Sequence, residues 1–203
     1  NTIKGFTDDN PYISPTQFIT QTNKKHLFFG GINGKLFSDI SYDFRASYSD
    51  EDDKALFVRN NSKSNGTNST GLLGYEYGNS FSVVYDDVKS LSFSGEVIVD
   101  INRNLVVGAN GRFNLYLVTN QIEAWNLPTI NANIFGNYKT TKWYASINIF
   151  VVSERKDVTY TGTYASAING FQTLKSFIDL NINGGYHFND KFTAFLKINN
   201  VLN

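Results

Sequence analysis

The residue types that usually perform catalysis or bind metals are few and scattered in this chain. Its 203 residues include no cysteine and two histidines, His26 and His187, which are far apart and lack the spacing of a metal or catalytic motif. The acidic run at 50–53 could supply oxygen ligands for calcium, and the alternative interpretation is a solvated loop. We therefore expect no enzymatic activity, no metal site and no cofactor.

The overall charge and composition argue against several other classes of protein. Eighteen Lys and Arg residues balance 18 Asp and Glu residues, so the chain lacks the excess of positive charge with which proteins bind nucleic acids. No run of about 18 consecutive apolar residues is present, so no membrane-spanning helix is expected. Aromatic residues make up 15% of the chain although its mean hydropathy is negative. This combination is compatible with strands on which apolar and polar residues alternate.

Apolar and polar residues alternate with a period of two along most of the chain, which indicates β-strands with two different faces. Between 105 and 117, for example, Leu105, Val107 and Phe113 share one face, whereas Asn110 and Arg112 lie on the other. The same pattern predicts strands at 26–36, 39–58, 80–101, 105–117, 129–139, 142–152, 173–188 and 191–200. The acidic run interrupts the second of these strands.

The links between these strands alternate strictly between tight and long. Tight links lie at 37–38, 102–103, 140–141 and 189–190, whereas long links cover 60–79, 118–127 and 154–172. Tight turns at one end and long loops at the other are typical of outer-membrane barrels, which have short periplasmic turns and long outer loops. The predicted fold class is therefore all-β: an antiparallel transmembrane β-barrel, of which about eight strands are present, in the bacterial outer membrane.

The direction of the strands predicts that this barrel is incomplete. With the tight turns in the periplasm, the first strand begins outside the cell and the last strand ends there. Single-chain bacterial barrels have an even number of strands and normally keep both ends in the periplasm. We therefore expect residues 1–203 to be part of one outer-membrane barrel domain, with at least one further strand at each end and no plug domain in this segment.

The polar faces carry short side chains such as Asn and Ser more often than Lys and Glu, which suits a confined, wet barrel lumen. On this interpretation the apolar faces contact lipid. The residues expected to face the lumen, where they would bind a plug or a substrate or pair with one another, are Asp43, Arg45, Glu96, Arg112, Asn131, Asn133, Asp179, Asn181 and Lys197. The residues expected in an interfacial aromatic girdle, at strand ends of the apolar face, are Tyr48, Tyr138, Trp143, Tyr186 and Phe188.

Four aromatic residues fall on the predicted outer loops and are candidates for ligand binding. They are Trp125, Tyr160, Tyr164 and Phe171. Aromatic side chains on loops can stack on sugars or on flat ligands. The alternative interpretation places the same residues in the aromatic girdle or in the packing of the loops.

Several short segments resemble parts of the barrels of TonB-dependent receptors. The segment 10–15 (Asn-Pro-Tyr-Ile-Ser-Pro) is similar to a barrel motif of this family, although the glutamate that usually follows it is Thr16 here. The segment 192–203 resembles the penultimate strand and its Asn-Asn-Leu-type ending, and 176–181 resembles the strand before it. The segment 124–128 (Ala-Trp-Asn-Leu-Pro) is similar to divergent receptor-like barrels of Bacteroidetes type.

This resemblance implies the C-terminal barrel portion of a receptor with about 22 strands. It also implies outer-membrane lipid as surroundings and, where a plug exists upstream, a TonB-type energy-coupling partner. The first functional hypothesis is ligand binding and import across the outer membrane. The second is a plugless barrel that acts as a structural subunit of a secretion or assembly complex, alongside other outer-membrane subunits. The third is a soluble, secreted, glycan-binding β-sandwich.

Overall fold

The computed structural model describes residues 19–59, 81–160 and 168–202. Within these ranges the chain consists of strands and turns. The strands are β1 (Lys24–Leu36), β2 (Ile40–Arg59), β3 (Phe81–Asn102), β4 (Leu105–Val118), β5 (Ile130–Lys139), β6 (Trp143–Val152), β7 (Arg155–Tyr160), β8 (Ile168–Leu174), β9 (Phe177–Asn189) and β10 (Phe192–Ile198). None of the described segments forms a helix long and apolar enough to cross a membrane. The motif at 10–15 lies outside the described residues.

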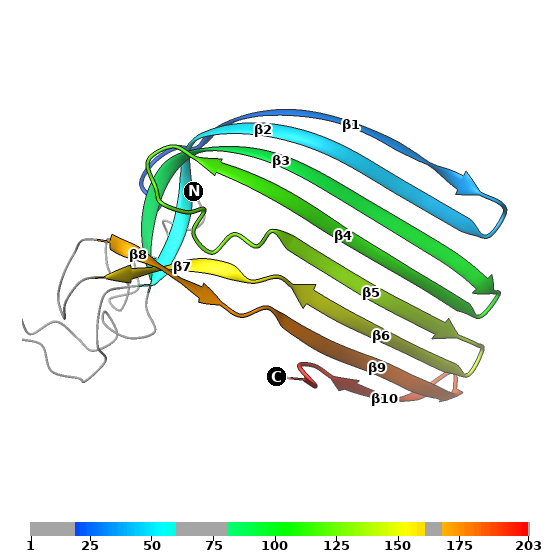
Figure 1. Ribbon diagram of the computed structural model, residues 1–203. Coiled ribbons are helices and arrows are strands. Elements are labelled where there is room, and N and C mark those ends of the chain that lie inside the picture. The colour runs from blue at the N-terminus through cyan, green and yellow to red at the C-terminus, as the bar shows by residue number, and fades with distance from the viewer. Residues whose placement is uncertain (1–18, 60–80, 161–167, 203) are drawn as a thin grey trace, which may run out of the picture.

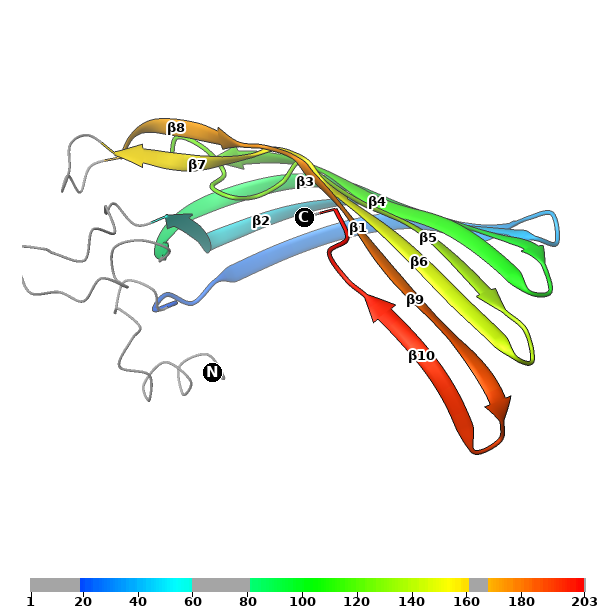
Figure 2. The same cartoon turned by 90° about the horizontal axis from the view of Figure 1, so that it is seen from below.

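Eight of the strands form one antiparallel sheet, in the order β1-β2-β3-β4-β5-β6-β9-β10. Figures 1 and 2 show that this sheet is long, curved and open, with β1 and β10 at its edges. The eight predicted strands and their antiparallel order are confirmed. The predicted fold class, a partial antiparallel barrel, is also confirmed.

The four tight turns lie at one end of the sheet (Figure 1) and are stabilised by local side-chain hydrogen bonds. The Asn102 Oδ1 accepts the backbone N–H groups of residues 104 and 105 at 2.8 and 3.0 Å. The Asn189 Oδ1 accepts the N–H of Lys191 at 2.9 Å, and the Thr140 Oγ1 accepts the N–H of Trp143 at 2.8 Å. Short polar side chains that bond to nearby backbone favour such turns, which explains why these links were recognisable in the sequence.

The link between β6 and β9 is long, as the prediction of a long link at 154–172 requires, but it contains two strands that were not predicted. Strands β7 and β8 lie between β6 and β9 and form a separate two-stranded antiparallel sheet. Its inward side chain Val158 is fully buried, and Tyr160 and Ile168 pack beside it. Two strands are too short to show a clear alternation, and burial against β2 stabilises them instead.

The expected interruption of the second strand is wrong, because β2 continues through the acidic run. The register of β2 against β3 shifts between Glu51 and Lys54, and Asp53 has a φ of 52°. This geometry is a β-bulge, which inserts unpaired residues and bends the strand. The bulge exchanges the two faces of β2, so that Leu56 and Val58 lie on the same face as Glu51.

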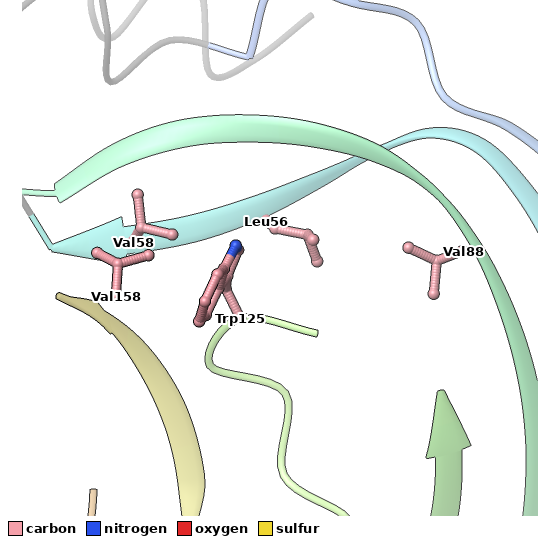
Figure 3. Close-up of a cluster of buried hydrophobic side chains, with 5 residues drawn as sticks. All are labelled: Leu56, Val58, Val88, Trp125 and Val158. Atoms are coloured by element: carbon pink, nitrogen blue, oxygen red, sulfur yellow. The ribbon is translucent and has the colours of Figure 1, made fainter. Parts of the chain in front are cut away.

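A small apolar cluster forms where the long loops leave the sheet. Leu56, Val58, Val88, Trp125 and Val158 are 1% exposed or less and lie side by side (Figure 3). They come from β2, β3, β7 and the segment 119–129 between β4 and β5. We call this group the outer cluster. It fastens the β4–β5 segment and the β7–β8 hairpin to the extended ends of β2 and β3.

We predict that Trp125→Ala lowers the free energy of unfolding by about 3–5 kcal/mol, because it opens a cavity in the outer cluster. Ile122→Ala, in the same segment but 54% exposed, should cost less than about 0.5 kcal/mol. Each substitution is made in the complete protein, which is refolded into lipid vesicles. Denaturant titration then measures the free energy of unfolding of the two variants. Equal losses would show that Trp125 does not anchor the segment.

Candidate functional site

The register of the main sheet brings the polar residues of successive strands into rows on one face, which we call the polar face. In one row Asp43 pairs with Glu96, Glu96 with Asn110, and Asn110 with Asn133. In the next row Arg45 pairs with Ser94, Ser94 with Arg112, and Arg112 with Asn131. The same register places Asp179, Asn181 and Lys197 on this face. All nine residues expected to face a lumen therefore share one side of the sheet.

All members of these two rows except Arg45 line a hollow of about 660 Å³ in the polar face. In the described part of the chain, the side chains of Asp43, Glu96 and Arg112 form no ion pair with one another, and the Oδ1 of Asn133 is buried without a hydrogen-bond partner. The Arg45 guanidinium lies 5.4 Å from the centre of the Phe29 ring. A wall with both signs of charge and unsatisfied polar groups is suited to contact another polar surface.

Burial on the two faces is the reverse of that in a water-soluble sheet. Polar side chains of the polar face, such as Ser49, Ser90 and Asn114, are 6% exposed or less. Large apolar side chains of the opposite face, which we call the apolar face, are open: Phe28 is 68% exposed and Leu117 is 67% exposed. An apolar face of this extent needs a non-aqueous neighbour.

An aromatic ladder runs across the tight-turn end of the apolar face. The rings of Trp143 and Tyr186 are 4.6 Å apart, those of Tyr186 and Phe188 are 4.7 Å apart, and those of Phe188 and Phe192 are 5.1 Å apart. Trp143 is 57% exposed. Aromatic rings at this level of a barrel are typical of a membrane–water interface. Tyr138 lies on the same face near this end, and Tyr48 lies towards the other end.

Two of the four loop aromatics serve packing. Trp125 is wholly buried in the outer cluster, and its Nε1–H donates to the Oε1 of Gln121 at 2.8 Å. The expectation that Trp125 is open to a ligand is therefore wrong, because the β2–β3 extension covers its ring. Tyr160 is partly buried beside the same cluster, and its hydroxyl donates to the backbone carbonyl of Arg59 at 2.8 Å.

Phe171 is the loop aromatic whose ring is open to solvent. It lies on β8 and is 46% exposed, with the Nζ of Lys156 at 4.9 Å from the ring centre. That Nζ also donates to the Thr173 Oγ1 at 2.7 Å. Phe171 therefore remains a candidate for ligand contact. Tyr164 lies outside the described residues.

A buried carboxylate that the sequence reading missed holds the β4–β5 segment in place. Asp86 is 3% exposed, and its two oxygens accept the backbone N–H groups of Thr119, Asn120 and Gln121 at 2.9–3.1 Å. Burial raises the pKa of this carboxyl, but the backbone hydrogen bonds outweigh burial and leave the pKa below its usual value. The sequence does mark this residue: Asp86 is an acidic residue between Val84 and Val88, on the inward, otherwise apolar side of β3.

A second tie joins the far end of this segment to β2 and β7. Asn126 adopts a φ of 57°, and its Nδ2 donates to the Phe57 carbonyl at 2.8 Å and to the Asp157 Oδ1 at 3.1 Å. The backbone N–H of Asn126 donates to the carbonyl of Lys156 at 2.8 Å. Asparagine tolerates this left-handed conformation better than most residues, which explains its place here.

The side chains of the acidic run at 50–53 point to different faces of the sheet and do not form a cation site. Glu51 points to the polar face, where its Oε1 lies 2.6 Å from the Nζ of Lys54 and 3.2 Å from the Nζ of Lys25. Burial raises the pKa of Glu51. The hydrogen bonds and positive charges of the two lysines lower it by more, so the pKa lies below its usual value. Asp50 and Asp52 lie on the opposite face. Within the described ranges, no group of three or more His, Asp or Glu residues is placed to hold a metal ion.

Comparison with solved structures identifies the fold. No family model and no curated protein sequence matches the chain. The copper transporter OprC superposes with a TM-score of 0.59 at 14% identity over 88% of this chain and 25% of that one. The ferripyoverdine receptor of the outer membrane of Pseudomonas aeruginosa gives 0.60 at 14% identity, over 88% of this chain and 23% of that one. The siderophore receptor PirA from Acinetobacter baumannii gives 0.61 at 15% identity, over 88% and 27%.

The chain thus spans about a quarter of the length of these proteins. Its fold is that of part of an outer-membrane receptor barrel. A two-layered sandwich, the third hypothesis from the sequence, is not the architecture found. The neighbours are named as transporters and receptors rather than as enzymes.

We predict that Asp86→Asn releases the β4–β5 segment and costs about 1–3 kcal/mol, because an amide cannot accept all of the backbone N–H groups. Since the pKa of Asp86 is lowered in the fold, its stabilising effect is full above the usual aspartate pKa and is lost as pH falls through the lowered value. Trp125 fluorescence in a Trp143→Phe background reports the release as a red shift on acidification.

The matched control is Asp190→Asn, on the exposed β9–β10 turn, which should leave the acid transition unchanged. The Asp86→Asn protein should show the released spectrum already at neutral pH. An acid transition that is identical in wild type and Asp86→Asn would show that another group controls the segment.

Proposed function

We propose that this chain forms part of the wall of a TonB-dependent-type receptor barrel in the bacterial outer membrane, which binds a ligand outside the cell and imports it. The observation that carries this proposal is the reversed burial of the two sheet faces. The apolar face would contact the hydrocarbon core of the membrane, and the polar face would line the lumen. The aromatic ladder at the tight-turn end would lie at the periplasmic interface.

Backbone satisfaction supports the same placement. Eight strands pair in an unbroken series from β1 to β10, so the N–H and C=O groups between them are paired within the sheet. Lipid tolerates strands only when the backbone groups are paired in this way, because hydrocarbon offers no hydrogen-bonding partner. The two open edges would pair with further strands of the same barrel.

The charges of the polar face support a packed lumen. Glu96, Arg112 and Asn133 line the hollow without satisfying one another, so each has capacity left for an opposing surface. A plug domain inside the barrel would supply that surface and would respond to a TonB-type energy-coupling protein in the periplasm. The Bacteroidetes-type character of the barrel belongs to this proposal and rests on the short sequence resemblance at 124–128.

The ligand would reach the lumen past the outer cluster and the β7–β8 hairpin. Phe171 is the exposed aromatic side chain at this end that we assign to ligand contact, with Lys156 and Thr173 beside it. The names of the similar structures mention copper, ferripyoverdine and siderophores. These substances are therefore the first probes for this protein.

We predict a large difference between two neighbouring substitutions on β6. Ile147→Arg, on the apolar face, should cost about 2–4 kcal/mol if the site lies near the membrane midplane. Asn148→Arg, on the polar face opposite Asn181, should be much milder because a lumen can hydrate the charge. Equilibrium folding of the complete protein into phospholipid vesicles measures both. Equal costs would contradict the assignment of the faces.

We further predict that cells that produce the complete protein accumulate copper(II) or a ferric siderophore faster than cells without it, and that collapse of the proton-motive force removes the difference. Rates are measured with ⁶⁴Cu and with ⁵⁵Fe-loaded pyoverdine. The Phe171→Ala protein should show slower uptake at low probe concentration. Equal rates with and without the protein would contradict import of metals and metal chelates.

A further inference from the structure

The outer ends of β2 and β3 form a hairpin that projects beyond the rest of the sheet. Strand β4 pairs with β3 only from Val88 onward, so residues 81–87 of β3 pair with β2 alone. Figure 1 shows this pair curling past the end of β4. One face of the projection packs on the outer cluster. The other face continues the apolar face of the barrel outward.

Along the outward face of β2 and β3, the side chains change from apolar to charged towards the projecting hairpin. On β1, β2 and β3 the apolar face ends at a row formed by Phe28, Tyr48 and Leu91, whereas on β4 it extends one row further, to Leu117. The next row holds His26, Asp50 and Lys89. Above it lie the outward carboxylates of the bulge region, and the four acidic members of this belt are Asp50, Asp52, Asp53 and Asp87.

Most of the charge of this acidic belt is unpaired. Asp52 lies 3.9 Å from the Nζ of Lys24, a weak and exposed pair. Asp87 accepts a hydrogen bond from the backbone N–H of Asp53 at 3.0 Å. No Lys, Arg or His of the described segments lies within ion-pair distance of Asp50, Asp53 or Asp87. Lys24 and Lys89 lie in the same rows, so four carboxylates face two lysines and the belt still carries net negative charge.

Beyond the belt, two aromatic rings face outward. Phe57 and Phe81 lie on neighbouring strands with ring centres 5.5 Å apart in an edge-to-face arrangement, and they are 43% and 42% exposed. The bulge at Asp53 causes this arrangement, because it turns Leu56 and Val58 inward and leaves Phe57 outward. On β2 and β3 the acidic belt lies between this pair and the apolar band.

Polypeptide backbone already binds next to this pair. The Tyr85 hydroxyl oxygen, on the same face, accepts the backbone N–H groups of Thr20 at 2.6 Å and Gln21 at 3.3 Å. These residues precede β1 and lie in a different part of the chain. This face is therefore compatible with packing against protein rather than lipid.

We propose that the Phe57–Phe81 pair with its acidic belt is a docking surface for a partner protein whose contact has an apolar centre and a basic rim. Exposed apolar patches rimmed by charge mark protein interaction sites, and opposite charge at a rim selects the partner and speeds association. The proposal rests on the proposed membrane placement, which sets this surface outside the bilayer beside the barrel rather than inside it.

The test is photo-crosslinking in the native outer membrane of cells that produce the complete protein. A photoreactive amino acid replaces Phe57 or Phe81, and the control position is Phe93, which is 48% exposed within the apolar band. Positions 57 and 81 should give the same protein adduct, and position 93 should not give it. Asp50→Lys with Asp52→Lys should reduce the adduct several-fold, whereas Asp190→Lys, at the opposite end, should leave it unchanged.

Three results would overturn the proposal: no protein adduct at 57 and 81, adducts only with lipid or with this chain itself, or an adduct unaffected by the charge reversal. Quenching of Trp143 by brominated phospholipid separates this failure from failure of the proposed function. If Trp143 is quenched and the adduct is absent, only the docking surface is wrong. If Trp143 is not quenched, the membrane placement fails.

Discussion

Every part of this structure depends on one constraint: paired strands must satisfy their backbone hydrogen bonds while one face of the sheet stays apolar and uncovered. A soluble sheet would bury that face against a second layer. Here the eight strands from β1 to β10 pair in series, and the side that carries Phe28 and Leu117 remains open. The polar side chains, which would face bulk water in a soluble sheet, are instead the more sheltered ones. Both facts would follow from the proposed placement of the sheet as a wall between hydrocarbon and water.

The bulge at Asp52–Asp53 reverses which residues of β2 face outward. Below it, even-numbered residues of β2 face outward and are apolar, as Phe44 and Tyr48 are. Above it, odd-numbered residues face outward, and the even-numbered Leu56 and Val58 turn inward against Trp125. The hairpin thereby gains an apolar core of its own outside the proposed membrane. Glu51, paired with Lys25 and Lys54, lies at the boundary on the inner side.

The barrel wall could be predicted from the sequence because its information is local. Alternation identifies each strand, and Asn102, Thr140 and Asn189 mark the tight turns through hydrogen bonds to residues two or three positions away. The outer cluster could not be predicted, because its contacts join segments far apart in the chain. Asp86 bonds to residues 119–121, and Trp125 meets Val58 and Val158. A lone tryptophan in a loop has the same sequence signature whether it is buried or binds a ligand.

These long-range ties also decide which outer elements can move. The β4–β5 segment is held at Asp86, at Trp125 and at Asn126, where Asn126 reaches both β2 and β7. A segment held at three points in this way behaves as part of the wall. The β7–β8 hairpin packs on the outer cluster through Val158, Tyr160 and Ile168. It is also tied to β2, because the Asp157 Oδ1 accepts the backbone N–H of Arg59 at 3.2 Å and the Tyr160 hydroxyl donates to the Arg59 carbonyl at 2.8 Å. The hairpin and the β4–β5 segment share the hydrogen bonds of Asn126 to Asp157 and Lys156. Displacement of either element would therefore break contacts of the other.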